Sequence, residues 1–390
     1  MAQARPTHAG RLASDWTTPA TSLGRSARSF AERRPALAEP AERARRVTIS
    51  DIAEQAGVSK GAVSYALNGR PGVSDGTRER ILEIARELGW YPNRAARALS
   101  VERADACGLV LARPAKTIAL EPFFMEFIAG VESELSARSI ALSIQLVESV
   151  EDEIEVYRRW WGERRVDGVL MVDLREDDPR VRELVRLGLP AVVIGGPVEN
   201  GALPAVWHDE AGVVIEAVRY VAALGHTRIA RVAGVGEFVH TAQRTEGFLS
   251  ATEELGLDAE IIATDYSAES GARATRKLLS SPQPPSAIIY DSDLLAVTGL
   301  GVALQMGFAV PDEVSIIGWD DSLISQVVHP PLTAITRDIV AYGGTAIRHL
   351  LEVIEGRTVE DKETLRGELT PRGSTGPARQ GAGLPGVRRR

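Results

Sequence analysis

The feature that most constrains this fold is a long alternation of short apolar runs with amphipathic stretches, which begins at Cys107. The apolar runs read CGLVLA, ALSIQL, DGVLMV, AVVIG, RIARVAG, EIIA, SAIIYD and SIIGWD. Between them, apolar residues recur at helical spacing over residues 124–139, 180–187, 211–224, 241–255 and 270–279. Strands that alternate with helices indicate parallel sheets covered on both faces. We therefore predict an α/β body of two lobes that meet near residues 207–209.

Side chains near the ends of the predicted strands are candidates for ligand binding, because open α/β sheets bind ligands at the carboxyl ends of their strands. The candidates at these strand ends are Phe123, Phe124, Tyr290, Ser292, Asp293, Trp319 and Asp320. Carboxylate and guanidinium groups form paired hydrogen bonds with vicinal hydroxyls, and aromatic rings stack on the apolar faces of sugars. This set of side chains indicates a sugar as the ligand.

A second pattern, at residues 48–68, precedes this body. Thr48 and Asp51 have the spacing of a capping box, and Gly57 can supply a left-handed turn without steric cost. Ser59 caps a second helix whose outer face carries Lys60, Gly61, Ser64, Tyr65 and Asn68. The pattern is typical of a helix-turn-helix, in which the second helix reads DNA.

A third helix, capped by Ser74, follows, and then a segment at residues 94–100 that is too short to form a stable helix alone. Residues 43–103 contain 11 Lys or Arg and 7 Asp or Glu, whereas the whole chain has a net charge of −8. A basic segment on an acidic chain is typical of nucleic-acid binding.

The order of residues from Thr48 is specific: T-I-x-D-I-A-x-x-A-G-V-S-x-x-x-V-S-x-x-L-N, then V-S-x-x-T-R-x-R-I, then Y-P-N-x-x-A-x-x-L. This order closely resembles the LacI/GalR family of bacterial repressors, and the resemblance continues to about Ser374. It implies a DNA-binding head-piece, a hinge helix and a body like that of periplasmic sugar-binding proteins. It also implies a homodimer, and a late segment, residues 333–355, that returns to the first lobe.

The resemblance assigns DNA contacts along the head-piece. Residues 59–68 would enter the major groove, with Lys60 and Tyr65 as base readers and Gly61 able to contribute only its backbone. Phosphate contacts would come from Thr48, Ser64, Ser74, Thr77 and Asn93. Leu99, with Ala96 one turn earlier, would wedge into a minor-groove step. A two-fold dimer requires a near-palindromic operator.

The resemblance also assigns effector contacts in the body. Arg244 opens an R-x-x-G-F motif, Asp320 and Ser292 match contact positions, and Phe124 matches a ring-stacking position. Two departures leave the sugar open: Ser292 replaces an Asn found in many relatives, and Gly195 replaces an acid used by some sugar-responsive relatives.

Simpler roles remain for several of these residues. Asp293 could cap the helix that follows it, Asp321 could occupy a surface turn, and Leu99 could pack against the core. At the level of function, the alternatives are a regulator that responds to a nucleoside, purine or other metabolite, and a sugar-binding protein without a DNA role. Whether the regulator represses or activates depends on where its operator lies.

Enzymatic motifs are missing from the sequence. It has no H-E-x-x-H or H-x-x-x-H spacing, no G-x-S-x-G and no phosphate-binding G-x-x-x-x-G-K-[ST]. Its single cysteine, Cys107, excludes an intrachain disulfide, and no apolar run approaches the roughly 20 residues that span a bilayer. We expect a non-enzyme without metal or cofactor that acts in the bacterial cytoplasm on the nucleoid.

Five regions follow from these patterns. We predict a disordered extension at residues 1–46, a helix-turn-helix domain at 47–92, a hinge at 93–105, an effector and dimerisation domain at 106–376 and a disordered tail at 377–390. Within the effector domain, lobe 1 would hold residues 106–208 and 335–366, and lobe 2 would hold residues 209–334 and 367–376.

Overall fold

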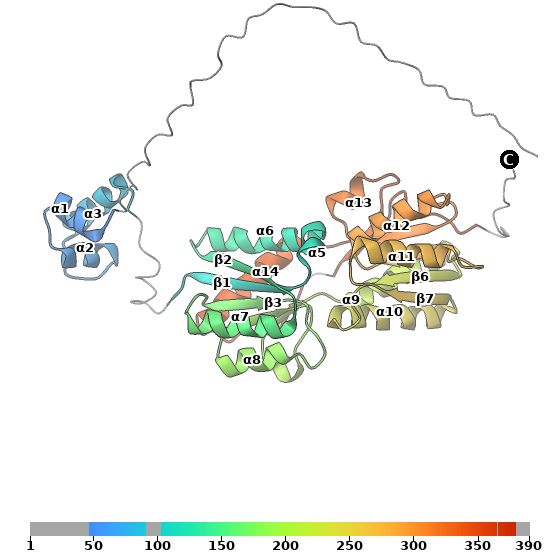
Figure 1. The fold of residues 1–390 in the computed structure, drawn as a ribbon, viewed down its shortest axis with the longest axis horizontal. Helices are drawn as coiled ribbons and strands as arrows, with labels where there is room; N and C mark the ends of the chain where they lie inside the picture. Colours follow the sequence, from blue (N-terminus) through green and yellow to red (C-terminus); the bar gives the residue numbers. More distant parts are fainter. Residues whose placement is uncertain (1–46, 91–102, 365, 380–390) are drawn as a thin grey trace, which may run out of the picture. The chain divides into compact units, whose positions relative to one another are not determined.

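The computed structural model describes residues 47–90, 103–364 and 366–379 of the 390-residue chain. The described residues fall into two compact units, residues 47–90 and residues 103–379. Figure 1 shows the helices and strands of both units, and each unit has its own hydrophobic core.

The first unit is a bundle of three helices: α1 (Ile49–Ala56), α2 (Lys60–Leu67) and α3 (Asp75–Glu87). Thr48 begins α1 by donating its backbone N–H and its hydroxyl to Asp51, both at 2.7 Å. Gly57 makes the turn with a φ of 66°, a conformation that glycine adopts without strain. The core holds the apolar faces of all three helices, including Ile52, Val63 and Ile81, and this arrangement is the predicted helix-turn-helix.

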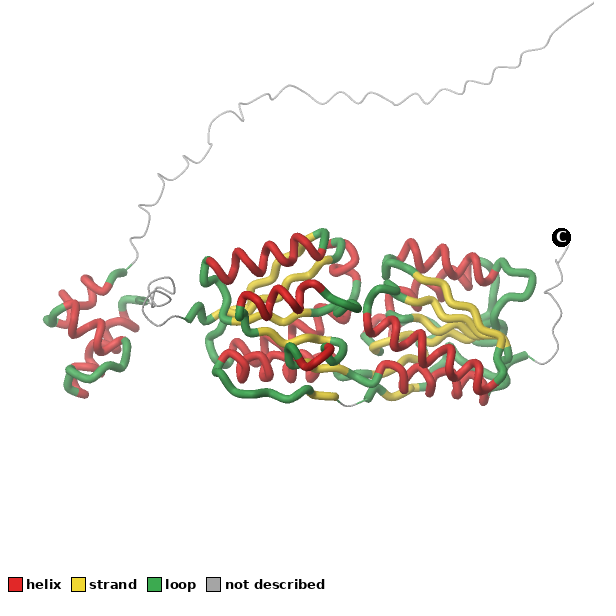
Figure 2. The backbone as a smooth tube through the Cα atoms, turned by 90° about the horizontal axis from the view of Figure 1, so that it is seen from below, coloured by secondary structure: helices red, strands yellow, loops and turns green. Residues whose placement is uncertain are grey.

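The second unit contains two six-stranded sheets, seen edge-on in Figure 2. The first sheet has the order β11-β5-β4-β3-β1-β2 and contains β1 (Ala106–Ala112), β2 (Ala141–Val147), β3 (Gly168–Met171), β4 (Ala191–Ile194), β5 (Ala205–Trp207) and β11 (Lys362–Glu363). The second has the order β12-β10-β9-β8-β6-β7 and contains β6 (Arg228–Ala233), β7 (Asp258–Ala263), β8 (Ala287–Tyr290), β9 (Ser315–Asp320), β10 (Thr333–Thr336) and β12 (Glu368–Thr370). Among the strands that the structure describes, β12 alone pairs antiparallel with its neighbour.

Helices cover both faces of each sheet. Lobe 1, built on the first sheet, carries α5 (Ala115–Leu120), α6 (Pro122–Ser136), α7 (Val150–Gly162), α8 (Pro179–Leu187), the short 3-10 helix η1 (Glu199–Gly201) and α14 (Ile339–Ile354). Lobe 2, built on the second, carries α9 (Glu210–Ala223), α10 (Val239–Leu255), α11 (Ala268–Leu279), α12 (Asp293–Gln305) and α13 (Leu323–Val327). The two-lobed α/β body confirms the predicted fold class.

Alternating residues along each strand supply two cores per lobe. In β1, Leu109 and Leu111 pack with residues of α6 and α14, whereas Val110 packs with Trp160 of α7 on the opposite face. This alternation follows from the two-residue period of a strand. Because both faces are buried, the strands read as continuous apolar runs, which is why most of them could be identified in the sequence.

Helices α6 and α14 approach each other closely through glycine. A Cβ on Gly130 of α6 would lie 2.0 Å from the carbonyl oxygen of Val340, and one on Gly343 of α14 would lie 2.2 Å from the carbonyl oxygen of Phe127. No side chain fits between these backbones, so α14 is held tightly against lobe 1 although it follows β10 of lobe 2.

Two predicted boundaries differ from the structure. The limit of lobe 2 at residue 334 falls inside β10, because Thr336 pairs with Asp320 in the second sheet. The chain is also ordered past residue 376, since the backbone N–H of Ala378 donates to Leu224 at 2.8 Å. Strands β5, β10, β11 and β12 have two to four residues each, too few for a periodic signal.

No helix among the described residues combines the length and apolar character needed to cross a membrane.

Candidate functional sites

The outer face of α2 is the first candidate site. Four residues at this face are exposed: Ser59, just before the helix, and Lys60, Gly61 and Asn68. Tyr65 is 45% exposed, and Ser64 is partly buried. Ser59 accepts a hydrogen bond from the backbone N–H of Ala62 at 3.1 Å, which leaves its hydroxyl proton available. The face therefore presents a cation, a phenol and hydroxyl groups to solvent.

The residues predicted to bind phosphates differ in whether their hydroxyl groups already make hydrogen bonds within the protein. Thr48 is exposed, but its hydroxyl proton is donated to Asp51, so Thr48 must release Asp51 before it can donate to a phosphate. Ser74 is the N-cap residue of α3, as predicted, but its hydroxyl makes no capping hydrogen bond to the helix backbone and shares a hydrogen bond with Thr77 at 2.9 Å. Asn93, Ala96 and Leu99 lie outside the described residues.

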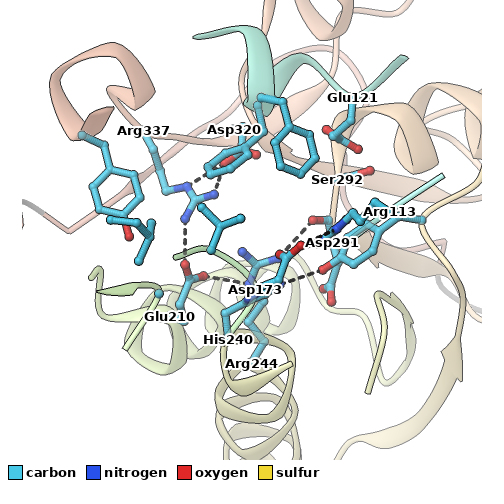
Figure 3. Close-up of a pocket in the computed structure, with 17 residues that line it drawn as sticks. Arg113, Glu121, Asp173, Glu210, His240, Arg244, Asp291, Ser292, Asp320 and Arg337 are labelled. Carbon is cyan, nitrogen blue, oxygen red and sulfur yellow. Dashed lines mark hydrogen bonds and ion pairs between the residues drawn. The ribbon is translucent and has the colours of Figure 1, made fainter. Parts of the chain in front are cut away.

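The second candidate site is a cleft between the lobes. In both sheets the strand order reverses at the first strand of the lobe, β1 or β6, and this switch point is where open α/β sheets bind ligands. The cleft has about 590 Å³ of empty space, partly open to solvent. Lobe 1 contributes Arg113, Glu121, Phe123, Phe124, Val172, Asp173, Ile194, Gly195 and Tyr342, and lobe 2 and its connections contribute Glu210, His240, Arg244, Tyr266, Asp291, Ser292, Asp320 and Arg337 (Figure 3).

Five of the eight predicted effector contacts line this cleft: Phe123, Phe124, Arg244, Ser292 and Asp320. The other three do not. Tyr290 turns into the core of lobe 2, where its hydroxyl shares a hydrogen bond with Thr275 at 2.9 Å. Trp319 is fully buried behind the cleft, with its ring 4.0 Å from the Arg244 guanidinium.

Asp293 does not line the cleft and instead connects two elements of lobe 2. Its carboxylate accepts hydrogen bonds from the backbone N–H of Trp319 at 3.0 Å and from the backbone and hydroxyl of Ser322 at 2.7 and 2.6 Å. Asp293 therefore ties the start of α12 to the end of β9. Burial raises its pKa to about 7. Ser292, not Asp293, caps α12, by accepting from the backbone N–H of Leu295.

Four charged side chains form a continuous chain along lobe 2. Arg244 donates to Glu210 at 2.7 Å and to the carbonyl oxygen of Asp291 at 3.0 Å. Arg337 donates to the other oxygen of Glu210 at 2.7 Å and to Asp320 at 2.6 Å. Burial opposes ionisation of Glu210, but the two guanidinium groups outweigh it and hold its pKa well below the usual range.

Arg113 and Asp173 form a second ion pair, at the ends of β1 and β3. Two parallel hydrogen bonds of 2.6 Å join the guanidinium and the carboxylate, the bidentate geometry that arginine favours. Burial opposes the charge of Asp173, but Arg113 outweighs burial and lowers the pKa of the carboxyl. The guanidinium also lies 4.8 Å from the ring centres of Phe238 and Tyr266, so it is enclosed by aromatic faces.

His240 shares a hydrogen bond with the Tyr266 hydroxyl at 3.1 Å. Burial, together with the nearby Arg244, lowers the pKa of His240 to about 4, so the ring is neutral near pH 7. Within the described parts of the chain, no group of three or more His, Cys, Asp or Glu residues is arranged to hold a metal ion.

Several lining residues were missed from the sequence. Arg113 directly follows β1 and Asp173 lies two residues after β3, so both could have been found by the strand-end rule. Arg337 directly follows β10, a strand too short to give a periodic signal, and Glu210 is the first residue of α9, so neither is marked by a recognisable strand. Tyr342 lies on α14 and reaches the cleft only because its helix returns to lobe 1.

Contacts between the lobes border the cleft. The backbone N–H of Val239 donates to the carbonyl oxygen of Leu174 at 2.8 Å, and Arg175 donates to Glu237 at 2.8 Å. Residues 174–175 follow β3 of lobe 1, whereas residues 237–239 lead into α10 of lobe 2. The lobes therefore touch directly beside the space that a ligand would fill.

Comparisons with known proteins find matches for both units of the chain. The family model "Bacterial regulatory proteins, lacI family" matches residues 48–93, and the model "Periplasmic binding protein-like domain" matches residues 218–375. The HTH-type transcriptional regulator CelR of Thermobifida fusca is 33% identical over 324 residues, which is 82% of this chain and 95% of CelR.

Two solved structures share the fold. The structure of a CelR–cellobiose complex is 31% identical, with a TM-score of 0.64, and the match covers 84% of this chain and all of that chain. The Lac repressor dimer bound to operator and the anti-inducer ONPF is 26% identical, with a TM-score of 0.76, and the match covers 85% of this chain and all of that chain.

A helix-turn-helix unit joined to a periplasmic-binding-protein-like body defines a class of DNA-binding transcriptional regulators. The relatives that match are transcriptional regulators, not enzymes. The chain belongs to the LacI family.

Proposed function

We propose that this regulator represses carbohydrate genes by binding a near-palindromic operator as a homodimer, and that a sugar in the cleft controls this binding. The observation that carries the proposal is the lining of the cleft. Arginine, carboxylate and aromatic side chains from both lobes converge on one space at the switch points of both sheets. A relative of known structure binds cellobiose, which supports a sugar as the ligand.

On the DNA side, α2 enters the major groove, and Lys60 and Tyr65 read base edges. A lysine can donate to O6 and N7 of guanine, and Tyr65 is held in place by packing against Gly72. Ser59, Ser64, Asn68, Ser74 and Thr77 fix the register through phosphates or base edges. In the hinge, Asn93 contacts a phosphate, while Ala96 and Leu99 pair with their dimer mates and open a minor-groove step.

Gating follows from the position of the ligand between the lobes. A sugar that contacts both lobes favours one arrangement of lobe 1 relative to lobe 2, and lobe 1 is the lobe that continues from the hinge. If the hinge segments of a dimer are moved apart, they can no longer bend the operator together. Such coupling is reciprocal, because the ligand and the operator must change each other's affinity by the same factor.

Exposed apolar side chains support the homodimer. On α13 of lobe 2, Leu323 and Val327 are 71% and 69% exposed, which is unusual for large apolar residues unless another surface covers them. A two-fold dimer places two α2 helices against two half-sites of the operator. As a DNA-binding regulator, the dimer acts in the cytoplasm.

The test is selection of bound DNA from a randomised pool at fixed salt, repeated with a panel of monosaccharides and disaccharides. We expect an enriched near-palindrome that is lost, or strongly weakened, when one sugar is added. Salt must be held constant because phosphate contacts make affinity steeply salt-dependent.

Other outcomes redirect the proposal. A palindrome that no sugar affects would reject the sugar and favour a nucleoside or another metabolite as the effector. Failure to enrich any sequence would contradict the operator-binding mechanism itself.

A further inference from the structure

The three arginines of the cleft are already paired with carboxylates of the protein. Arg113 donates two hydrogen bonds to Asp173. Glu210 accepts one hydrogen bond from Arg244 and one from Arg337. Arg337 also donates to Asp320. All these side chains are at most 15% exposed. The charge of each guanidinium group is therefore already neutralised by a carboxylate, so an anionic ligand would bring an uncompensated charge into a buried site.

The lining is also balanced in charge. Three guanidinium groups face three carboxylates, and the further carboxylate of Asp291 is paired with Arg231 at 2.8 and 2.6 Å behind the cleft. His240 is neutral near pH 7, as described above. The lining therefore offers no unpaired cation among the described residues, and the one acidic side chain left out of this balance is Glu121.

Glu121 is a buried carboxyl with a free oxygen. It lies at the start of α6, lines the cleft beside Ser292 (Figure 3) and is only 5% exposed. Its Oε2 atom has no hydrogen-bond partner in the described ranges. A buried polar atom without a partner is costly, so Oε2 marks a position where a ligand would supply the missing hydrogen bond.

The surroundings of Glu121 favour its protonated form. The groups that face it are Asp320 at the end of β9, Ser292 and Asp293 at the start of α12, and Arg113 after β1. Burial is the largest influence, and the two aspartates reinforce it, so that the pKa of Glu121 rises to about 8 despite Ser292 and Arg113. Near pH 7 the carboxyl carries a proton and can both donate and accept a hydrogen bond.

We propose that the effector is an uncharged, hydroxyl-rich sugar, and that the buried carboxyl of Glu121 is the specificity-determining group, which bonds one of its hydroxyls through the unpartnered Oε2 atom. This inference rests on the proposed function and narrows it, because it excludes sugar phosphates and sugar acids. An amino sugar is also disfavoured, because an ammonium group requires the ionised form of Glu121.

The first experiment measures binding to the full-length protein by calorimetry at pH 7. The probes are the neutral monosaccharides and disaccharides of the operator panel, their 6-phosphates, their uronate and amino counterparts, and inorganic phosphate. We expect a neutral sugar to bind at least about tenfold more tightly than each charged counterpart, and inorganic phosphate not to bind. Tighter binding of any charged counterpart would overturn the inference.

The second experiment uses variants of Glu121 and the best neutral sugar. Because only the protonated form binds, the wild-type affinity should fall about tenfold between pH 7 and pH 9. Glu121→Gln should bind nearly as well as wild type at pH 7 and lose this pH dependence, whereas Glu121→Ala should bind about tenfold more weakly. Glu132→Gln removes the same charge from the exposed face of α6 and should behave like wild type. An unchanged pH profile in Glu121→Gln would refute the role of Glu121.

A third measurement needs no ligand. The folded-state pKa of Glu121 lies above its unfolded value, so its contribution to stability is complete below about pH 4.5 and is lost as the pH rises to about 8. The melting temperature of wild type relative to Glu121→Gln should therefore fall over this range and then level off. A panel in which no sugar binds would reject the sugar of the proposed function, and the present inference with it, whereas the next two outcomes would leave the proposed function standing. A flat melting-temperature difference, or binding of inorganic phosphate, would reject the present inference.

Discussion

At the scale of single residues, the cleft is organised by side chains that hold one another. Glu210 binds Arg244 with one carboxylate oxygen and Arg337 with the other, so both guanidinium groups are fixed before a ligand arrives. Trp319 supports Arg244 from behind, with the guanidinium 4.0 Å from its ring centre. Arg244 can thus present its remaining donors to a sugar without losing much conformational entropy on binding.

Arg244→Ala tests this arrangement. We expect operator binding to be unchanged, because Arg244 lies in the body and not in the helix-turn-helix unit, and sugar affinity to fall about 10- to 100-fold through loss of charge-assisted hydrogen bonds. Calorimetry with the sugar and fluorescence anisotropy with the operator measure the two effects. Arg276→Ala, which removes an exposed arginine of α11, is the control. Normal sugar affinity in Arg244→Ala would show that Arg244 does not contact the sugar.

Only some of the residues predicted from the sequence to contact the effector line the cleft, and the reason is physical. Phe123, Ser292 and Asp320 could be found because each lies close to the end of a recognisable strand or the start of a helix. Tyr290 and Trp319 lie on strands too, but the pleat turns their side chains into the two cores of lobe 2. Deciding between core and cleft requires the exact register of the strand end, which the apolar run alone does not give.

At the scale of elements, the position of α14 decides whether the cleft can form. This helix follows β10 of lobe 2 yet packs on α6 in lobe 1, and it brings Tyr342 to the cleft. The sequence alone did not give this crossing, and the resemblance to a known family supplied it. The glycines at the contact, Gly130 and Gly343, show why the helices come so close: each lies against a carbonyl oxygen of the other helix.

Gly130→Ala should destabilise lobe 1. A methyl group at this position would overlap the Val340 carbonyl, and such overpacking costs about 1–3 kcal/mol in the free energy of unfolding. Denaturant unfolding followed by circular dichroism measures the loss. Gly301→Ala is the matched control, because a Cβ at this position in α12 contacts nothing within 4 Å, and alanine there should be neutral or stabilise by up to about 1 kcal/mol. Equal effects of both changes would contradict close helix packing as the cause.

At the scale of the whole molecule, the body has two lobes that contact each other directly beside the cleft. The ion pair of Arg175 with Glu237 is exposed, with side chains 29% and 72% accessible, and exposed pairs contribute at most about 1 kcal/mol. This ion pair therefore contributes little to holding the lobes together, and a ligand that contacts both lobes can change their arrangement.

Arg175→Ala should lower sugar affinity by no more than about fivefold, the equivalent of 1 kcal/mol. Combining it with Glu237→Ala in a double-mutant cycle isolates the energy of the pair. A loss much greater than tenfold would mean that Arg175 contacts the sugar or that the pair controls closure by itself.

The dimer is tested by placing charge on α13. The double variant Leu323→Glu and Val327→Glu should sediment as a monomer and lose most of its operator affinity, because a single head-piece contacts only one half-site. Val185→Glu on α8, at another half-exposed apolar residue, should leave the dimer intact. A double variant that remains dimeric would place the interface elsewhere on the body.

The central claim is that ligand binding in the cleft and DNA binding by the helix-turn-helix unit are coupled. The most direct measurement is the affinity of the sugar for the free protein and for the protein saturated with its operator, beside the operator affinity with and without sugar. The account predicts that the two ratios are equal and differ from one, typically by about 5- to 150-fold. The same sugar affinity in the free and DNA-bound protein would contradict the account.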